Sequence, residues 1–290
     1  MTGETHDRST QDVGNIVALE HVNVMIPDQQ VATLFYVVGL GLTRDPYLMT
    51  GLENMWINIG QQQFHLTTGR PQVLRGHVGL VIPDHGELPA RLEAIKPRLA
   101  GTRFEYALED KHIRVVSPWG NVIRCYAPGP AFGTMTLGMA YVEFPVEPGA
   151  ADGIARFYRA ALGAPALAVR NGGGTAARVT VGPHQELVFR ETADAIPAYD
   201  GHHLQIYIAN FSGPHRWLGE RGLVTEESNW YQYRFQDIVD PDTNRPLFTI
   251  EHEVRSLLSP LYMRPLVNRN PAQRQPTYQR GRDPFVPGMA

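Results

Sequence analysis

Two histidines stand at the head of the same short motif near the start of the chain. The pattern His-Val-x-x-x-Ile-Pro-Asp runs from His21 to Asp28 and again from His77 to Asp84. Imidazole is a common metal ligand and a general acid or base near neutral pH. The repeat therefore predicts a fold made of copies of one unit, with a side chain that can bind a metal at the same place in each copy.

Each motif has the alternation of a β-strand followed by a helix. Apolar residues at 22, 24 and 26 alternate with His21, Asn23 and Met25, so one face is apolar and the other carries the histidine. Pro-Asp then ends the strand, and the aspartate can cap a helix. Helical spacing follows in 29–41, with apolar positions Val31, Leu34, Phe35 and Val38, and in 85–99, which Pro97 interrupts. Short strand-like runs come next, so the unit is one strand, one helix and about three strands.

The same unit recurs at a longer period. Phe-Tyr-x-x-x-Leu-Gly occurs at 35–41 and 157–163, and the strand that begins at His77 recurs at His203. The third unit opens at Met139, which takes the place of the histidine. The chain then holds four units in two tandem pairs, which predicts domains at 16–128 and 136–256, separated by a Gly/Pro-rich stretch, and an extended tail at 257–290.

Composition excludes several classes of protein. The 290 residues are 43% hydrophobic and 19% charged, with a net charge of −3 and no basic block, so nucleic acid is not an expected partner. The one cysteine, Cys125, lies in an apolar run and is expected to be buried and inert. Because no apolar stretch is long enough to span a membrane and the N-terminus is polar, we expect a cytoplasmic protein.

In their order, these motifs resemble the vicinal oxygen chelate superfamily, the group of glyoxalases, fosfomycin-resistance proteins and extradiol dioxygenases. The resemblance covers about residues 17–256. It implies an α+β fold of four βαβββ modules that form two curved mixed sheets, with helices outside and cup-shaped cavities. It also implies a metal held by a first-strand histidine of one module, and by a first-strand histidine and a last-strand glutamate of its partner.

The resemblance points to particular ligands. First-strand positions fall on His21, His77, Met139 and His203. In the first domain the last-strand glutamate position falls on Arg124. In the second domain we favour Glu251, the first carboxylate on the face that points into the cup, over Glu253. We interpret His65 and His112 as structural residues.

How the modules pair decides whether a complete site exists. If each domain closes on itself, the first cup contains Arg124, which cannot ligate a cation because it is always protonated. If module one pairs with module four, one cup holds His21, His203 and Glu251, a ligand set that suits Fe(II), with Mn(II) or another divalent metal as alternatives. We favour this second pairing, which looks like that of the ring-cleaving hydroquinone dioxygenases. The other cup would hold His77, Met139 and Arg124 and no metal.

The resemblance implies a metal-dependent dioxygenase of the extradiol ring-cleaving type, acting with O₂ on an aromatic diol or a chelating phenol. Tyr233 and Asp237 are the candidate acid–base residues, and Asn23, Gln205 and Tyr207 are candidates for positioning the substrate. The alternatives are a glyoxalase-type metal-dependent lyase or isomerase, and a metal-free protein of the same fold that binds a small molecule.

The tail is rich in Pro, Arg and Asn and lacks periodicity, so it cannot pack a core of its own. We expect it to cover a cup as a lid or to lie against a second subunit of a homo-oligomer.

Overall fold

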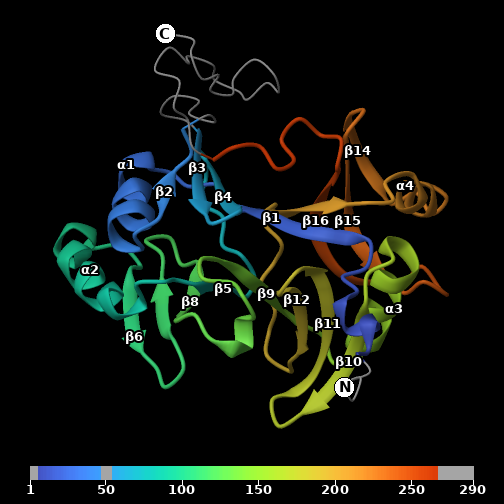
Figure 1. Cartoon of the computed structure of the whole chain (residues 1–290), viewed down its shortest axis with the longest axis horizontal. Helices are drawn as coiled ribbons and strands as arrows, with labels where there is room; N and C mark the ends of the chain where they lie inside the picture. Colours follow the sequence, from blue (N-terminus) through green and yellow to red (C-terminus); the bar gives the residue numbers. More distant parts are fainter. Residues whose placement is uncertain (1–5, 47–53, 267–290) are drawn as a thin grey trace, which may run out of the picture.

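The computed structural model describes residues 6–46 and 54–266 and consists of four βαβββ modules in sequence order (Figure 1). Module 1 contains β1 (Ile16–Asn23), α1 (Gln29–Ala32) with its continuation η2 (Thr33–Gly39), β2 (Thr43–Arg44), β3 (Asn54–Ile59) and β4 (Gln62–Thr67). Module 2 contains β5 (His77–Val81), η3 (His85–Glu87), α2 (Leu88–Ile95), η4 (Lys96–Leu99), β6 (Glu105–Leu108), β7 (Ile113–Val116) and β8 (Val122–Tyr126).

The second half repeats the order. Module 3 contains β9 (Gly138–Val146), α3 (Ala151–Leu162), β10 (Ala166–Asn171), β11 (Gly174–Gly182) and β12 (Gln185–Glu191). Module 4 contains β13 (His203–Ile208), α4 (Ser212–Gly219), β14 (Val224–Asn229), β15 (Gln232–Val239) and β16 (Pro246–Ser256). Short 3-10 turns, η1 (Arg8–Gln11) and η5 (Pro130–Phe132), lie outside the modules. The predicted α+β fold of four modules is confirmed.

The modules pair across the whole chain. One eight-stranded sheet has the order β14-β15-β16-β13-β1-β4-β3-β2, and the other has the order β10-β11-β12-β9-β5-β8-β7-β6. Module 1 therefore shares a sheet with module 4 through the antiparallel pair β1/β13, and module 2 with module 3 through β5/β9. This is the pairing that we favoured from the ligand positions. Each sheet takes one module from each of the predicted domains 16–128 and 136–256.

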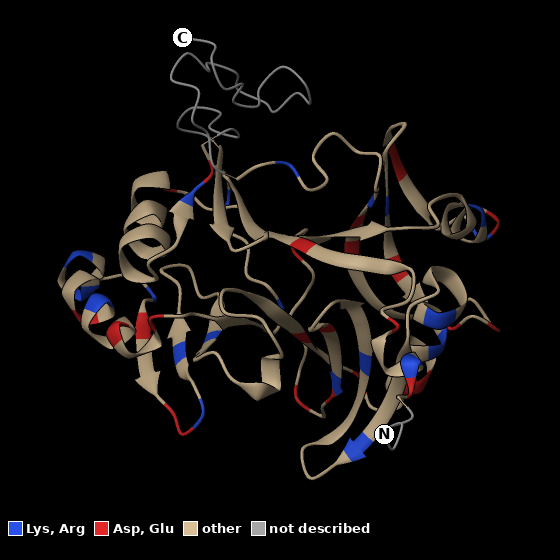
Figure 2. Cartoon of the chain, in the orientation of Figure 1, with Lys and Arg blue, Asp and Glu red and all other residues tan. Residues whose placement is uncertain are grey.

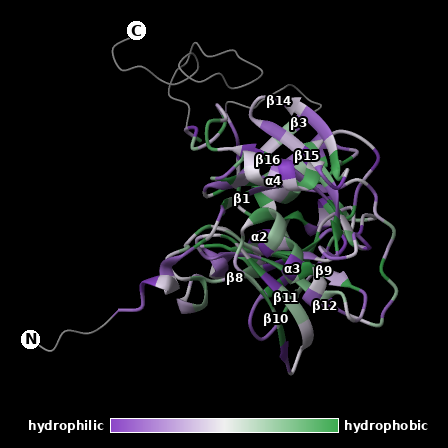
Figure 3. Ribbon diagram, turned by 90° about the vertical axis from the view of Figure 1, so that its right-hand side faces the viewer, coloured by the Kyte–Doolittle hydropathy of each residue, from purple (hydrophilic) through white to green (hydrophobic). Residues whose placement is uncertain are grey.

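The two sheets share one hydrophobic core. Apolar side chains of β1 and β13 belong to the same buried cluster as those of β5 and β9. Hydrophobic segments are concentrated in the strands at the centre of the molecule (Figure 3). Helix α2 packs on η2 at one end, and α3 packs on α4 at the other. Positively and negatively charged residues both occur on α2 and α3 (Figure 2). No helix among the described residues is long and apolar enough to cross a membrane.

Local details of the first two modules differ from the expectations. Asp28 caps its helix by accepting from the backbone N–H groups of Gln30 and Val31, whereas Asp84 pairs with Arg91 instead. The first helix widens after Ala32 into a π-helical turn, in which the N–H of Leu40 donates to the carbonyl of residue 35. Wider turns change which residues share a face. Val38 is therefore 50% exposed and lies outside the core, although the helical spacing had predicted it on the apolar face.

Candidate metal centre

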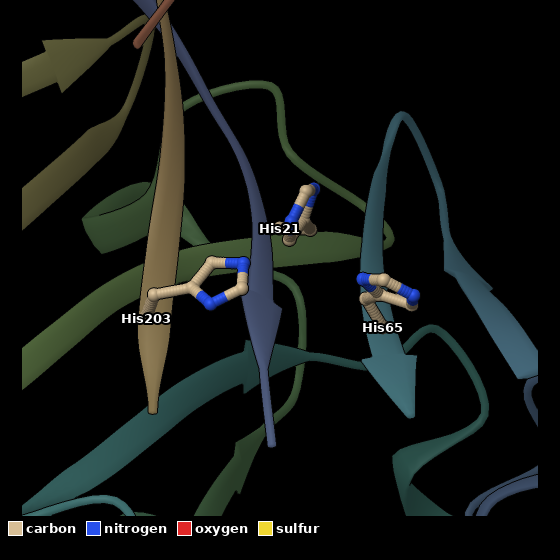
Figure 4. Close-up of side chains that lie close together, drawn as sticks. All are labelled: His21, His65 and His203. Carbon is tan, nitrogen blue, oxygen red and sulfur yellow. The ribbon is translucent and has the colours of Figure 1, made fainter. Parts of the chain in front are cut away.

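Three histidines from neighbouring strands converge in the cup formed by modules 1 and 4. His21 lies on β1, His65 on β4 and His203 on β13, and β1 runs between the other two strands (Figure 4). One possible ligand atom from each ring lies within 4.8 Å of those of the other two. Among the residues that the structure describes, this is the group that could hold a metal ion.

The strand register explains why these side chains share a face. On β1, His21 is opposite Gln205 of β13 and Gln63 of β4, and two residues further on Asn23 is opposite both His203 and His65. Side chains two residues apart point to the same side of a strand. The alternate positions of β1, such as Val22, enter the hydrophobic core, so the imidazoles lie on the opposite face.

His21 has the features of an oriented ligand. Its ring is completely buried, and its Nδ1 lies 2.5 Å from Oε2 of Glu20. A β-bulge between Leu19 and His21 shifts the register by one residue, which turns two consecutive side chains toward the cup. A carboxylate that accepts the Nδ1 proton leaves the Nε2 lone pair for a metal. That Nε2 is buried and has no hydrogen-bond partner among the described residues.

The charge on Glu20 is stabilised in place. Burial by itself would raise the pKa of its carboxyl, but the contact with His21 and the positive charges of Arg255 and Arg264 outweigh burial, and the pKa is lowered. Glu20 is therefore ionised at neutral pH and can hold the His21 ring.

His203 is in the protonation state that binds metals. Burial, with the positive charge of Arg234 among the further causes, holds the pKa of His203 well below its usual range. The Nε2 of His203 is buried without a hydrogen bond, although it lies 3.6 Å from Oε2 of Glu253. Its Nδ1 lies 3.5 Å from Oε1 of Glu251. A neutral imidazole with a free lone pair is the ligating form.

His65, which we had interpreted as structural, completes the cluster. Its Nε2 lies 2.8 Å from Oδ1 of Asn54 and its Nδ1 lies 2.6 Å from Nδ2 of Asn23, and its ring stacks on Trp56. Nε2 therefore carries the proton, and Nδ1 has the lone pair. Burial holds the pKa of His65 well below its usual range, so the ring is neutral. A metal would compete with Asn23 for the Nδ1 lone pair.

One signal in the sequence could have revealed His65. The last strands of modules 1 and 4 occupy corresponding places, because Gln63 is opposite His21 as Glu251 is opposite His203. His65 then corresponds to Glu253, two residues further on. Comparing these two strands residue by residue places a histidine of module 1 at a position that faces the cup.

Glu251 lies where the resemblance implied, directly opposite His203 on β16, but its carboxylate has another partner. Arg234 on β15 makes ion pairs with both Glu251 and Glu253, and Arg255 makes a second one with Glu253. Since one guanidinium holds both carboxylates, Glu251 would have to leave Arg234 to enter a ligand set. The strand register therefore favours Glu251 over Glu253 as the residue beside His203, whereas the ion pair opposes its use as a ligand.

The three candidates for substrate positioning all lie in or next to this cup. Asn23 is bound to His65, as described above. Gln205, opposite His21, is fully buried, and neither atom of its amide group has a partner among the described residues. Tyr207 lies further along β13 and packs edge-on against Tyr262. Gln205 is the one whose free polar atoms are beside the histidine cluster.

Of the two candidate acid–base residues, Tyr233 points away from the histidine cluster, and Asp237 does not belong to the group of ligand atoms within 4.8 Å of one another. Tyr233 is opposite Val254 on β16 and packs against Phe211 and His215, so it lies in the hydrophobic core on the other face of the sheet. The alternation of the strand is the reason, since its neighbour Arg234 takes the face that points into the cup. Asp237 accepts a hydrogen bond from Oγ1 of Thr249, at 2.8 Å.

The start of the tail closes one end of the cup. Tyr262 and Arg264 line a small pocket of about 60 Å³ together with Glu20 and Tyr207. Arg264 is buried and pairs with Asp45 at 2.6 Å. The described tail residues from Leu261 onward thus lie against side chains of β1 and β13, and the remainder of the tail lies outside the described residues.

The cup formed by modules 2 and 3 has different side chains at the corresponding places. His77 on β5 is opposite Glu143 on β9, and Tyr141 is opposite Gly79. The expectation that Met139 would stand where the histidines do was wrong. A bulge after Gly79 shifts the register, so Met139 pairs with Leu80 and enters the core.

The overall fold is similar to that of several solved structures. Glyoxalase I from Zea mays has a TM-score of 0.55 at 14% sequence identity, with 85% of this chain and 94% of that chain covered. A protein described as a putative dioxygenase from Bacillus subtilis has a TM-score of 0.55 at 15% identity, with 83% of this chain and 86% of that chain covered. No protein-family model and no curated protein matches the sequence. At these identities the likeness establishes the fold, which is the vicinal oxygen chelate fold in its four-module form.

Proposed function

We propose that the cup of modules 1 and 4 binds a divalent metal through His21, His65 and His203, and that the protein is a metal-dependent enzyme. The observation that carries this proposal is the pair of buried Nε2 atoms of His21 and His203, which lack hydrogen bonds among the described residues. Leaving buried polar atoms unpaired costs about 1–3 kcal/mol each, unless a ligand satisfies them. A divalent cation accepts lone pairs from both rings at once.

The donor set narrows the choice of metal. Three imidazoles suit iron and zinc, whereas manganese prefers oxygen ligands. We propose Fe(II), in line with the ligand set that the sequence suggested, with His65 in place of Glu251. When bound, such a metal lowers the pKa of a coordinated hydroxyl and so prepares it for reaction.

The residues around the cluster have separable roles. Glu20 fixes the ring of His21, and Arg234 holds the negative charges of Glu251 and Glu253 beside His203. Gln205 can donate and accept hydrogen bonds to a polar substrate with its unpaired amide. Trp56 packs on His65 and keeps that side of the cup apolar. We therefore propose that the substrate is a small aromatic molecule with two adjacent oxygens.

The reaction that we propose is dioxygenation of an aromatic diol or chelating phenol. The support is the pairing of module 1 with module 4, which unites His21 and His203 in one sheet. The test is oxygen uptake by the iron-loaded protein with a panel of catechols and hydroquinones. Uptake that needs both substrate and metal supports the proposal, and its absence with every member of the panel contradicts it.

A lyase or isomerase of the glyoxalase kind is the second candidate. Tyr233 points away from the histidine cluster and Asp237 bonds to Thr249, whereas the carboxylates of Glu251 and Glu253 lie within 3.6 Å of His203. A carboxylate beside a metal can move a proton without oxygen. Turnover of a vicinal-oxygen substrate under anaerobic conditions would favour this candidate. Purified protein that binds no divalent metal at all would leave the third possibility, a metal-free binding protein.

A further inference from the structure

The cup of modules 2 and 3 contains a cavity of its own. It has a volume of about 320 Å³ and lies between β5, β8, β9 and β12. Its polar lining residues are His77, Arg124, Glu143, Arg190, Thr192 and Asp194. A volume of this size is in the range of small-molecule sites.

The lining of this cavity contains two arginines and two carboxylates, of which Arg190 and Glu143 form an ion pair. Arg190 binds Glu143 through two hydrogen bonds of 2.8 and 2.9 Å, so this pair is neutral. Arg124 makes no ion pair with a carboxylate in the described part of the chain. Its neighbour across the strands is another arginine, Arg114, which is paired with Glu105. Arg124 is thus a cation of the lining without an ion pair among the described residues, although its side chain bonds to Tyr141 and its charge helps to lower the pKa of Glu143.

His77 adds hydrogen-bonding capacity without charge. Burial and the nearby Arg124 lower the pKa of His77 to about 4, so the ring is neutral at neutral pH. Its Nε2 lies 3.3 Å from the hydroxyl of Tyr141, which in turn bonds to Tyr126 at 2.8 Å. The ring of Tyr141 lies over Gly79, where a Cβ would approach it to 2.1 Å. These contacts fix the wall beside Arg124.

We propose that this second cup binds a small organic carboxylate, with Arg124 as its charged partner. The planar guanidinium of arginine matches a carboxylate with two parallel hydrogen bonds. A cation without an ion pair favours a ligand with one negative charge, and the carboxylates of Glu143 and Asp194 oppose a dianion such as a phosphate. The site is separate from the histidine cluster, because the two cups lie in different sheets.

The test is a titration of the full-length protein with 4-fluorobenzoate, followed by ¹⁹F NMR, which detects millimolar binding. We expect saturable binding that acetate displaces at lower concentration than inorganic phosphate does. Arg124→Gln is expected to weaken binding at least about tenfold, as the loss of a charge-assisted hydrogen bond does. Arg124→Lys keeps the charge and is expected to lose less.

Two matched variants complete the experiment. Arg114→Gln removes the arginine directly opposite Arg124 but outside the cavity lining, and is expected to bind 4-fluorobenzoate like the wild type. His203→Ala removes a proposed metal ligand in the other cup and is also expected to bind normally, so the result is independent of the proposed enzyme. Circular dichroism checks that each variant is folded.

Three results would overturn the proposal. They are the absence of binding of both fluorobenzoate and acetate by the wild type, equal affinity in the folded Arg124→Gln variant, and stronger displacement by phosphate than by acetate.

Discussion

The two cups of this protein share one backbone plan but differ in the chemistry of a few side chains. In each cup, two first strands pair antiparallel at the centre of an eight-stranded sheet. At the corresponding positions the first cup has His21 and His203, and the second has His77 and Tyr141. On the neighbouring last strand, Gln63 is opposite His21 and Val122 is opposite His77. Two residues further along, that strand has His65 in the first cup and Arg124 in the second.

These substitutions change what each cup can bind. The first cup offers buried lone pairs, which attract a cation, whereas the second offers the guanidinium of Arg124, which forms no ion pair among the described residues and attracts an anion. The module thus supplies positions, and the residue at each position decides the ligand. A histidine at the head of the repeat does not by itself define a metal site, since the group that could hold a metal among the described residues includes His21 and His203 but not His77.

The largest expected effect comes from breaking the first cup at its centre. His21→Ala or His203→Ala removes a proposed ligand, so metal affinity is expected to fall by at least about 100-fold, more than the loss of an outer partner costs. His77→Ala, the same change at the corresponding position of the second cup, is expected to leave the metal content unchanged. Mass spectrometry of metals in the purified proteins measures both. Equal metal content in all four proteins would contradict the assignment.

A second comparison tests whether the third ligand is His65, which lies in the histidine cluster, or Glu251, which the resemblance implied. His65→Gln is expected to weaken metal binding at least about tenfold, whereas Glu251→Gln is expected to change it by less than about threefold, because Arg234 already holds that carboxylate. Titration of the metal-free proteins with Fe(II) under anaerobic conditions gives both affinities. The opposite order would restore the set His21, His203 and Glu251.

Removing the partner of a ligand is expected to have an intermediate effect. Glu20→Gln keeps the size of the side chain but loses the charge that holds Nδ1 of His21, and outer partners of this kind are worth roughly 10- to 100-fold in metal affinity. Glu143→Gln makes the same change in the second cup and serves as the control. If both variants bound metal as the wild type does, Glu20 would have no orienting role.

The smallest expected effect concerns stability and pH in the metal-free protein. The pKa of His77 is about 4 in the folded state because of burial and Arg124, compared with about 6.5 in the unfolded chain. The unfolded state therefore takes up the proton first as the pH falls, and stability is lost between about pH 6.5 and pH 4. Between pH 6.5 and 5.5 this one residue accounts for about 1 kcal/mol.

His77→Gln should reduce the loss of unfolding free energy over that interval by this amount. Urea denaturation at the two pH values measures the difference. Identical pH dependence in the variant and the wild type would mean that His77 is not held neutral by the second cup.

The sequence by itself determined the repeating unit and the direction of most cup residues. Alternation along a strand is a local property, so His21 and Asn23 could be assigned to the same face before any contact was known. The motif repeats located four modules, and the resemblance placed Glu251 beside His203, where it lies. The seven-residue motif Phe-Tyr-x-x-x-Leu-Gly likewise marked the helices η2 and α3.

The ligand positions favoured the pairing of modules 1 and 4, but only the tertiary structure decided between the two pairings and showed which side chains meet. The β1/β13 contact joins residues far apart in the chain, and strand periodicity contains no information about the partner strand. The ion pair between Glu251 and Arg234 could not be predicted from the sequence either, and neither could the position of His65 beside His21. Each of these contacts depends on a neighbouring strand. The β-bulges could not be predicted from the alternation of residues. Each bulge shifts the strand register, so that Glu20 faces the first cup and Met139 enters the core.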